Sequence, residues 1–254
     1  MKKLIINTSV LLISFMLVFS SCKKFLDQEV PGAFAEEDFY KTDLDATQAV
    51  TAVYDMMQAH YNNNWGSLYM VKTLLSDESN AGGSDAGDQP GYQTIDNYNF
   101  ESTNDKILDS WRMCYFTIYR ANKVINRTLP ETDMRKRLIA EAKFLRAYNY
   151  FELVSLWGDV PLVLNDIPPA QYTTTGRKPK ATVYAQIEKD LAEAIPNLPL
   201  RSAYGGGDRF RVSKGAAQAL LGKALLYQQK YAESAAQFET VITSGQFSLA
   251  PSVG

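Results

Sequence analysis

Apolar residues recur at three- and four-residue intervals through most of the chain, which is the pattern of amphipathic helices. We predict six helices, over residues 42–61, 104–127, 132–157, 182–198, 213–229 and 231–244. Thr42 and Ser213 are suited to cap helix starts, and Gly158 and Gly245 to end helices. Strand signals are sparse, with one short extended segment at 159–163. The pattern therefore predicts a mainly α fold of stacked helical pairs joined by long loops.

The last two predicted helices are joined by a very short turn, which is typical of helical-repeat arrays. Laid on the tetratricopeptide pattern, Leu221-Gly222 takes the Leu-Gly step, Tyr231 the aromatic position at the turn, and Phe238 the aromatic position of the second helix. The match is partial, because Ser234 stands where a small residue such as alanine is expected. Small residues let paired helices approach closely, so we interpret this tetratricopeptide-like pair as scaffold.

The N-terminal segment is typical of an export signal. A short basic start precedes a mostly apolar run at residues 4–19, too short and too interrupted for a spanning helix. The Phe19-Ser20-Ser21-Cys22 sequence resembles a bacterial lipobox, in which the cysteine receives lipid. We predict a lipoprotein signal peptide at 1–21, lipidation of Cys22 and a tether at 22–41; the alternative is an ordinary signal with a chance cysteine.

Composition excludes several classes of function. The chain has 26 Lys and Arg against 28 Asp and Glu, so it has no summed positive field to attract nucleic acid. One histidine and two cysteines are too few for a zinc site, and we expect no metal and no cofactor. Lipidation of Cys22 would leave Cys114 without a partner for an intramolecular disulfide.

Several motifs occur in an order that resembles the SusD/RagB family. These are the lipobox, Lys24-Phe25-Leu26-Asp27, the segment 141–151 with its Ala-Lys-Phe-Leu-Arg-Ala-Tyr run, and Gly158-Asp159-Val160-Pro161-Leu162. The resemblance extends over nearly all of the chain after Cys22, so residues 42–254 are expected to form a SusD-like N-terminal helical domain. Family members are typically twice this length, which leaves three alternatives: the N-terminal half of a longer product, a gene fragment or a short relative.

The resemblance also implies a function. Its members are outer-membrane lipoproteins that capture an oligosaccharide or peptide without cleaving it. They pass the ligand to a SusC-like TonB-dependent transporter, which they cover as a hinged lid. We therefore expect a lipid-anchored, surface-exposed nutrient-binding protein rather than an enzyme. The alternatives are a helical-repeat envelope scaffold and a glycan hydrolase.

Residues 76–103 form a long polar stretch with asparagines, paired glycines and aromatic residues. A glycan receptor needs aromatic faces for stacking, and carboxylate or amide groups for hydroxyl hydrogen bonds. The candidate ligand residues are Asp77, Asn80, Tyr92, Asn97 and Tyr98. Without a basic cluster, the expected ligand is neutral and rich in hydroxyl groups. The alternative for each residue is that it only packs over the helices.

A catalytic interpretation rests on one acidic pair. Asp77 and Glu78 could serve as the two carboxyl groups of a glycoside hydrolase, but adjacent acids in a polar loop are more often solvated. Arg120 and Arg146 are predicted to pair with carboxylates such as Glu141 or Asp109. Aromatic residues at helical spacing are assigned to the core: Trp111, Tyr115, Tyr119, Tyr148, Tyr150, Phe151 and Trp157.

Overall fold

The computed structural model describes residues 39–62, 67–76, 78–85, 87–165, 167, 171 and 174–249. The chain divides into two compact units, Met1–Phe39 and Tyr40–Gly254, and the helices and strands of the described residues lie in the second. The predicted signal peptide, Cys22 and most of the tether lie outside the described residues, so lipidation of Cys22 stays a prediction.

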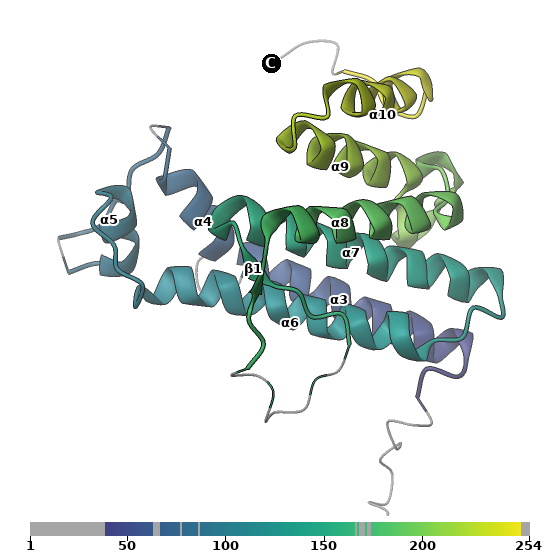
Figure 1. Ribbon diagram of the computed structural model, residues 1–254, viewed down its shortest axis with the longest axis horizontal. Helices are drawn as coiled ribbons and strands as arrows, with labels where there is room; N and C mark the ends of the chain where they lie inside the picture. The colour runs from purple at the N-terminus through teal and green to yellow at the C-terminus, as the bar shows by residue number, and fades with distance from the viewer. Residues whose placement is uncertain are drawn as a thin grey trace, which may run out of the picture. The chain divides into compact units, whose positions relative to one another are not determined.

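Helices make up nearly all the regular structure of the described residues (Figure 1). The elements are α3 (Asp43–Asn62), α4 (Ser67–Leu74), α5 (Pro90–Asp96), α6 (Asp105–Arg127), α7 (Asp133–Trp157), β1 (Val160–Pro161), β2 (Arg177–Lys178), α8 (Lys180–Ala194), η2 (Ile195–Asn197), η3 (Arg201–Ala203), η4 (Gly206–Phe210), α9 (Lys214–Tyr227) and α10 (Tyr231–Thr243). The two strands form one antiparallel pair with Val160 opposite Lys178. The predicted mainly α fold is confirmed.

Local capping explains where helices α3, α6, α7 and α9 begin. The Thr42 side chain accepts a hydrogen bond from the Asp45 N–H, and the Asp45 carboxylate accepts one from the Thr42 N–H. Asn104 caps α6, Thr132 caps α7 and Ser213 caps α9. All six predicted helices are present, and α4 and α5 are additional.

Helix α7 is the centre of the packing. It contacts α3, α6 and α8, and Figure 1 shows it between the α3–α6 layer and α8, with α9 and α10 beyond. Leu138, Tyr150 and Leu153 of α7 are fully buried. Because α7 is covered on several sides, its buried residues include charged side chains such as Glu141, Arg146 and Glu152 as well as apolar ones.

A buried ion pair joins α7 to α8. The Arg146 guanidinium donates to both carboxylate oxygens of Asp190, at 2.8 and 2.6 Å, and to the Asn122 side-chain oxygen at 2.8 Å. The predicted buried pairing of Arg146 is therefore found, with Asp190 as its partner instead of Glu141 or Asp109. Arg120 instead binds the Ala52 carbonyl and the exposed Asp55.

A second buried network ties α3 and α7 to the connection between α8 and α9. The Glu141 carboxylate is fully buried and accepts hydrogen bonds from the Tyr54 hydroxyl and from Arg211, both at 2.9 Å. Arg211 also donates to Asp208 at 2.8 Å. The Val212 N–H donates to the Tyr54 hydroxyl at 3.0 Å. Burial raises the pKa of Glu141, and the neighbouring Arg211 opposes that rise.

The final pair, α9 and α10, packs in the tetratricopeptide manner. A Cβ at Gly222 would lie 2.8 Å from the Phe238 ring, so glycine is required for this close approach. The Ser234 hydroxyl donates to the Gly222 carbonyl at 2.7 Å and is buried there. The serine at the small-residue position thus adds a hydrogen bond across the two helices.

Cys114 lies fully buried in α6 beside an ion pair between α4 and α7. Lys72 donates to both carboxylate oxygens of Glu152, at 3.0 and 2.8 Å. Burial raises the pKa of the Cys114 thiol, with a further contribution from Glu152, so the thiol stays neutral.

Candidate functional site

The predicted ligand-binding stretch, here called the acidic loop (residues 76–103), contains a short helix. This helix, α5, turns Tyr92 and Ile95 inward, where they pack with Val71 and Leu74 of α4. Tyr92 is only 3% exposed, and Lys106 lies 5.2 Å from its ring centroid. The prediction of Tyr92 as an exposed ligand ring is therefore wrong. The ring instead fixes α5 to the rest of the fold.

Tyr98 follows α5 and has the opposite environment. Its side chain is 63% exposed, and its hydroxyl donates to the Leu75 carbonyl at 2.7 Å. Its backbone adopts φ +54°, a left-handed conformation that is uncommon for a residue other than glycine. Such strained residues often occur at functional sites. The Tyr98 ring is thus held by its backbone at one end and by its hydroxyl hydrogen bond at the other, and its faces are still open to solvent.

Two of the other predicted ligand residues lie at the surface. Asn97 is exposed, and its side-chain amide donates to the Gln93 carbonyl at 2.8 Å, which leaves its oxygen available as an acceptor. Asn80 is exposed as well. Asp77 lies outside the described residues, so its role stays a prediction.

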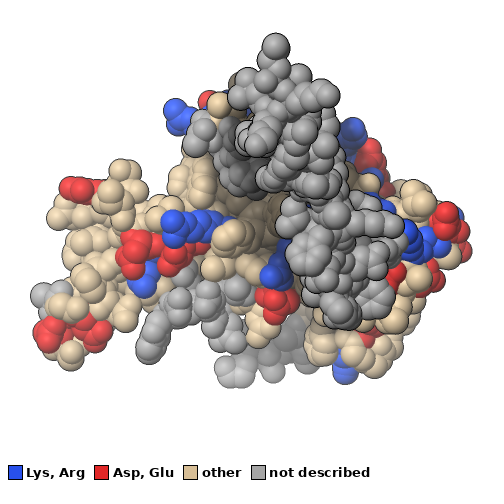
Figure 2. All heavy atoms as spheres, turned by 90° about the horizontal axis from the view of Figure 1, so that it is seen from below, with Lys and Arg blue, Asp and Glu red and all other residues tan. Residues whose placement is uncertain are grey.

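The charge of this region is one-sided. Between Lys72 and Lys106 the sequence has seven acidic residues and no Lys or Arg. Several of these acids hold the loop in shape, since Asp96 accepts from the Ala81 N–H and Asp88 from the Ser84 N–H. Figure 1 draws α5 at the left, and in Figure 2 the left end of the visible face carries acidic and uncharged side chains. This charge favours a neutral ligand over an anionic one.

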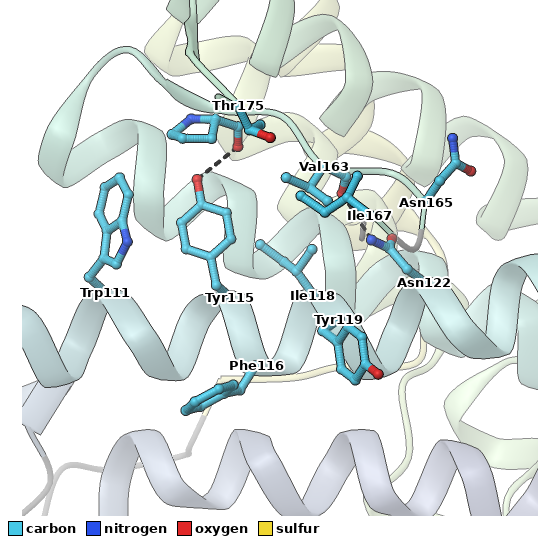
Figure 3. A pocket seen from close by; sticks show the side chains of 11 residues that line it. Trp111, Tyr115, Phe116, Ile118, Tyr119, Asn122, Val163, Asn165, Ile167 and Thr175 are labelled. Atoms are coloured by element: carbon cyan, nitrogen blue, oxygen red, sulfur yellow. Dashed lines mark hydrogen bonds between the residues drawn. The ribbon is translucent and has the colours of Figure 1, made fainter. Parts of the chain in front are cut away.

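A cavity of about 420 Å³ lies between α6 and the chain that follows β1. Figure 3 shows Trp111, Tyr115 and Ile118 extending from α6 toward Val163 and Ile167 on the opposite wall. The other lining residues are Phe116, Tyr119, Asn122, Pro161, Asn165 and Thr175. Trp111 packs edge-on against Trp157, with ring centroids 5.3 Å apart. The cavity therefore has an aromatic floor.

The polar groups of this cavity are largely used within the protein. The Tyr115 hydroxyl donates to the Pro161 carbonyl at 2.7 Å, and the Asn122 amide donates to the Val163 carbonyl at 2.9 Å. Burial raises the pKa of Tyr115, so its hydroxyl remains a donor. The cavity consequently offers apolar contact more than hydroxyl recognition.

The cavity corrects part of the core assignment. Tyr150 and Phe151 are buried, as predicted, but Tyr119 is 46% exposed. Trp111, Tyr115, Tyr148 and Trp157 are only partly buried. Of these residues, Trp111, Tyr115 and Tyr119 line the cavity. The helical spacing of these three fits a core-facing stripe and a cavity-facing stripe equally well, so periodicity alone could not separate the two.

The described residues were compared with the requirements of a metal-ligand cluster and of a membrane-spanning helix. Within them, histidine, cysteine, aspartate and glutamate form no group of three or more that could hold a metal ion. None of the helices described is both long and apolar enough to cross a membrane.

Comparison with known proteins places this geometry in a family. Residues 24–226 match the family model SusD-like_3, described as "Starch-binding associating with outer membrane". A SusD-like protein, P25, of Formosa agariphila is 28% identical over 258 residues, covering 94% of this chain and 47% of that protein. A SusD-like protein of Bacteroides ovatus is 26% identical, covering 89% of this chain and 39% of that protein.

Solved structures give the same result. A protein described as "Laminarin binding SusD-like protein" superposes with a TM-score of 0.72 at 33% identity, covering 80% of this chain and 44% of that chain. Surface glycan-binding protein A from Bacteroides fluxus superposes with a TM-score of 0.72 at 26% identity, covering 83% and 46%. The chain spans about half the length of the curated relatives it matches. The family match over residues 24–226, together with the helical fold shared with these structures, shows that the chain belongs to the SusD-like (SusD/RagB) family.

Proposed function

We propose that the chain is part of a non-catalytic, glycan-binding lipoprotein of the outer membrane, lipidated at Cys22. It captures an oligosaccharide or a peptide and passes it to a SusC-like TonB-dependent transporter. The observation that carries the proposal is the exposed ring of Tyr98, which is fixed through its hydroxyl to Leu75 beside the exposed amide of Asn97. A ring face next to an amide is the combination that a sugar ring with its hydroxyl groups requires.

The acidic loop suits this ligand better than the cavity on α6 does. A sugar presents hydroxyl groups around its ring, and each buried polar group left unpaired costs about 1–3 kcal/mol. In the cavity, Tyr115 and Asn122 already donate to backbone carbonyls. At the surface of the acidic loop, Asn80 and the side-chain oxygen of Asn97 remain open to a ligand.

The buried carboxylates support a binding role over hydrolysis. Glu141, Glu152 and Asp190 are each engaged by a cationic side chain. A glycoside hydrolase needs two carboxyl groups facing the scissile bond. Glu78, from the acidic pair in the sequence, is exposed to solvent.

Calorimetry with a panel of neutral oligosaccharides, including laminarin fragments, tests the ligand site. Stacking contributes about 0.5–1.5 kcal/mol beyond burial, so Tyr98→Ala should weaken binding by roughly two- to twelvefold. Asn97→Ala should weaken it less. Tyr231→Ala is the matched control, because Tyr231 on α10 is also 63% exposed. Equal affinities of the wild type and Tyr98→Ala would place the ligand elsewhere.

Two further experiments test the anchor and the partner. Cys22→Ala should move the protein out of the membrane fraction, and unchanged fractionation would contradict lipidation. Full-length protein purified from detergent-solubilised outer membranes should bring a TonB-dependent barrel with it. Recovery in an envelope complex that lacks a barrel would favour the helical-repeat scaffold.

A further inference from the structure

A second cavity, of about 410 Å³, lies in the segment that joins α8 to α9. We call this segment the arginine connection (residues 199–213). The cavity is far more polar than the one on α6, and it is lined by Arg201, Tyr204, Gly206, Arg209 and Phe210. Its volume falls within the range of about 300–1,000 Å³ that is usual for small-molecule sites.

The cavity is built on a fixed backbone despite the three glycines at 205–207. The Tyr204 hydroxyl donates to the Val212 carbonyl at 2.9 Å. Helix η4 is held by Asp208, which accepts from Arg211 at 2.8 Å, and Arg211 is in turn bound to the buried Glu141. The walls of the cavity are therefore positioned before any ligand arrives.

The two guanidinium groups of the cavity are not neutralised by any carboxylate of the described residues. Within that part of the chain neither Arg201 nor Arg209 forms an ion pair; they lie over the Phe247 and Phe210 rings, at 5.6 and 5.5 Å from the ring centroids. Asp208 is the only acidic residue of the arginine connection, and Arg211 binds it. The guanidinium groups of Arg201 and Arg209 therefore line the cavity without a paired carboxylate among the described residues. The one acid of the segment, Asp208, is already paired with Arg211.

An exposed ring stands beside these charges. Phe210 is 85% exposed, so most of its ring is open to a ligand at the cavity. Guanidinium groups bind the two oxygens of a carboxylate or sulfate in a fork-like geometry, and an aromatic face accepts the C–H side of a sugar ring. An acidic sugar has both features that these groups bind: an anionic group and a ring with a C–H face.

We propose that Arg201, Arg209 and Phe210 form a subsite for an anionic sugar residue, whose carboxylate or sulfate ester binds the two guanidinium groups while its ring contacts Phe210. The proposal rests on the proposed glycan-binding function and extends it from neutral to acidic glycans. An anionic membrane surface is a less suitable partner, because a headgroup array is flat and the arginines line a concavity.

Calorimetry with matched ligand pairs tests the subsite. Oligogalacturonides are compared with their methyl esters, and sulfated galactan fragments with their desulfated forms, so that the two members of each pair share their sugar sequence and differ in charge. The wild type should bind at least one charged member about three- to tenfold more tightly than its neutral partner, and the preference should fall with added salt. The pair that shows the preference identifies carboxylate or sulfate as the group bound.

Variants decide whether the cavity is responsible. The double variant Arg201→Gln/Arg209→Gln should lose the preference for charge, and Phe210→Ala should weaken both members of the pair. Arg177→Gln, which removes an exposed charge on β2, is the control and should leave the preference intact. A double variant that keeps the preference would overturn the subsite.

Two other outcomes would also overturn the proposal. One is equal binding of charged and neutral partners by the wild type. The other is binding to phosphatidylglycerol vesicles, lost in the double variant, without any binding of the charged oligosaccharides. Neutral laminarin fragments in the same panel report separately on the proposed function, because their binding depends on Tyr98 and not on these arginines.

Discussion

The acidic loop and the arginine connection both extend from the helical layers, but they are held by opposite means. In the acidic loop, Tyr92 and Ile95 of α5 are buried against apolar residues of α4. In the arginine connection, the fixed point is a buried carboxylate, Glu141, which binds Arg211 and the Tyr54 hydroxyl. One polar segment is thus ordered by apolar burial and the other by charge pairing.

The two segments also differ in the side chains that they expose to solvent. The acidic loop leaves an exposed tyrosine among acids and amides, and the arginine connection leaves an exposed phenylalanine beside two cations that no described carboxylate neutralises. An aromatic ring is common to both, so it is the charge around the ring that would select the sugar. If both proposals hold, one chain offers stacking rings to neutral and to acidic glycans.

Glu141→Ala should cause the largest loss of stability. Breaking a buried ion pair costs about 3–5 kcal/mol; here the substitution takes a hydrogen-bond acceptor from both Arg211 and the Tyr54 hydroxyl, and leaves Arg211 paired with Asp208. Urea unfolding followed by circular dichroism measures the loss. Glu239→Ala, at an exposed position of α10, should change stability by no more than about 0.5 kcal/mol. A similar small change in Glu141→Ala would remove the carboxylate from its supporting role.

Tyr92→Ala should be the next most severe change and should act mainly on the acidic loop. Removal of a buried aromatic ring costs about 3 kcal/mol, and hydrogen exchange should show the loss of protection concentrated in α5. Tyr98→Ala is the counterpart, because it removes an exposed ring and one surface hydrogen bond, at a cost of about 1 kcal/mol or less. Equal destabilisation by the two variants would end the distinction between an inner and an outer tyrosine.

Asp208→Asn separates two roles of Asp208 in the arginine connection, its hydrogen bond to Arg211 that holds η4 and its negative charge. The amide can still accept a hydrogen bond from Arg211, so stability should fall by only about 1 kcal/mol. Loss of the negative charge should raise affinity for the anionic glycan about twofold, since the charge is partly screened by solvent. Calorimetry measures the affinity, and a fall in affinity would mean that the position of η4 matters more than its charge.

The ion pair between Lys143 of α7 and Glu193 of α8 gives a surface reference for the buried network. The Lys143 Nζ and Glu193 Oε2 atoms lie 2.6 Å apart, and the hydrogen bond from Lys143 lowers the pKa of Glu193. A lowered folded-state pKa gives stability that is present above the ordinary glutamate value of about 4.3 and is lost as the pH falls through the folded value. Lys143→Gln should therefore flatten the acid side of the stability curve by about 0.2–1 kcal/mol. A curve identical to that of the wild type would show that the pair contributes nothing.

Helix positions could be predicted from the sequence because capping is local. Thr42, Thr132 and Ser213 each bind a backbone N–H three residues ahead, and that spacing is visible in the sequence. Helix α5 could not be predicted, because seven residues give too little periodicity to separate from a loop. The pairing of Arg146 is predictable, but its partner Asp190 lies 44 residues away and is fixed only by the packing of α7 on α8.

The sites were harder to predict than the helices. Tyr92 and Tyr98 are the same residue type six positions apart, and only contacts with α4 decide that the first is buried and the second exposed. Arg201 and Arg209 give no sequence signal of a basic cluster, because they are separated by seven residues and brought together by η3 and η4. Chemistry that depends on tertiary contacts requires the structure.

The enclosure of Cys114 makes this thiol a reporter of motion. The neutral, fully buried sulfur can react with a maleimide only when α6 separates from the helices that cover it. The rate of alkylation in native buffer therefore measures how often α6 moves away from the neighbouring helices α4 and α7. Because Cys114 is a native residue, the alkylation rate can be measured without an engineered label. A lower rate in the presence of glycan would show that ligand bound at the surface reduces how often α6 opens.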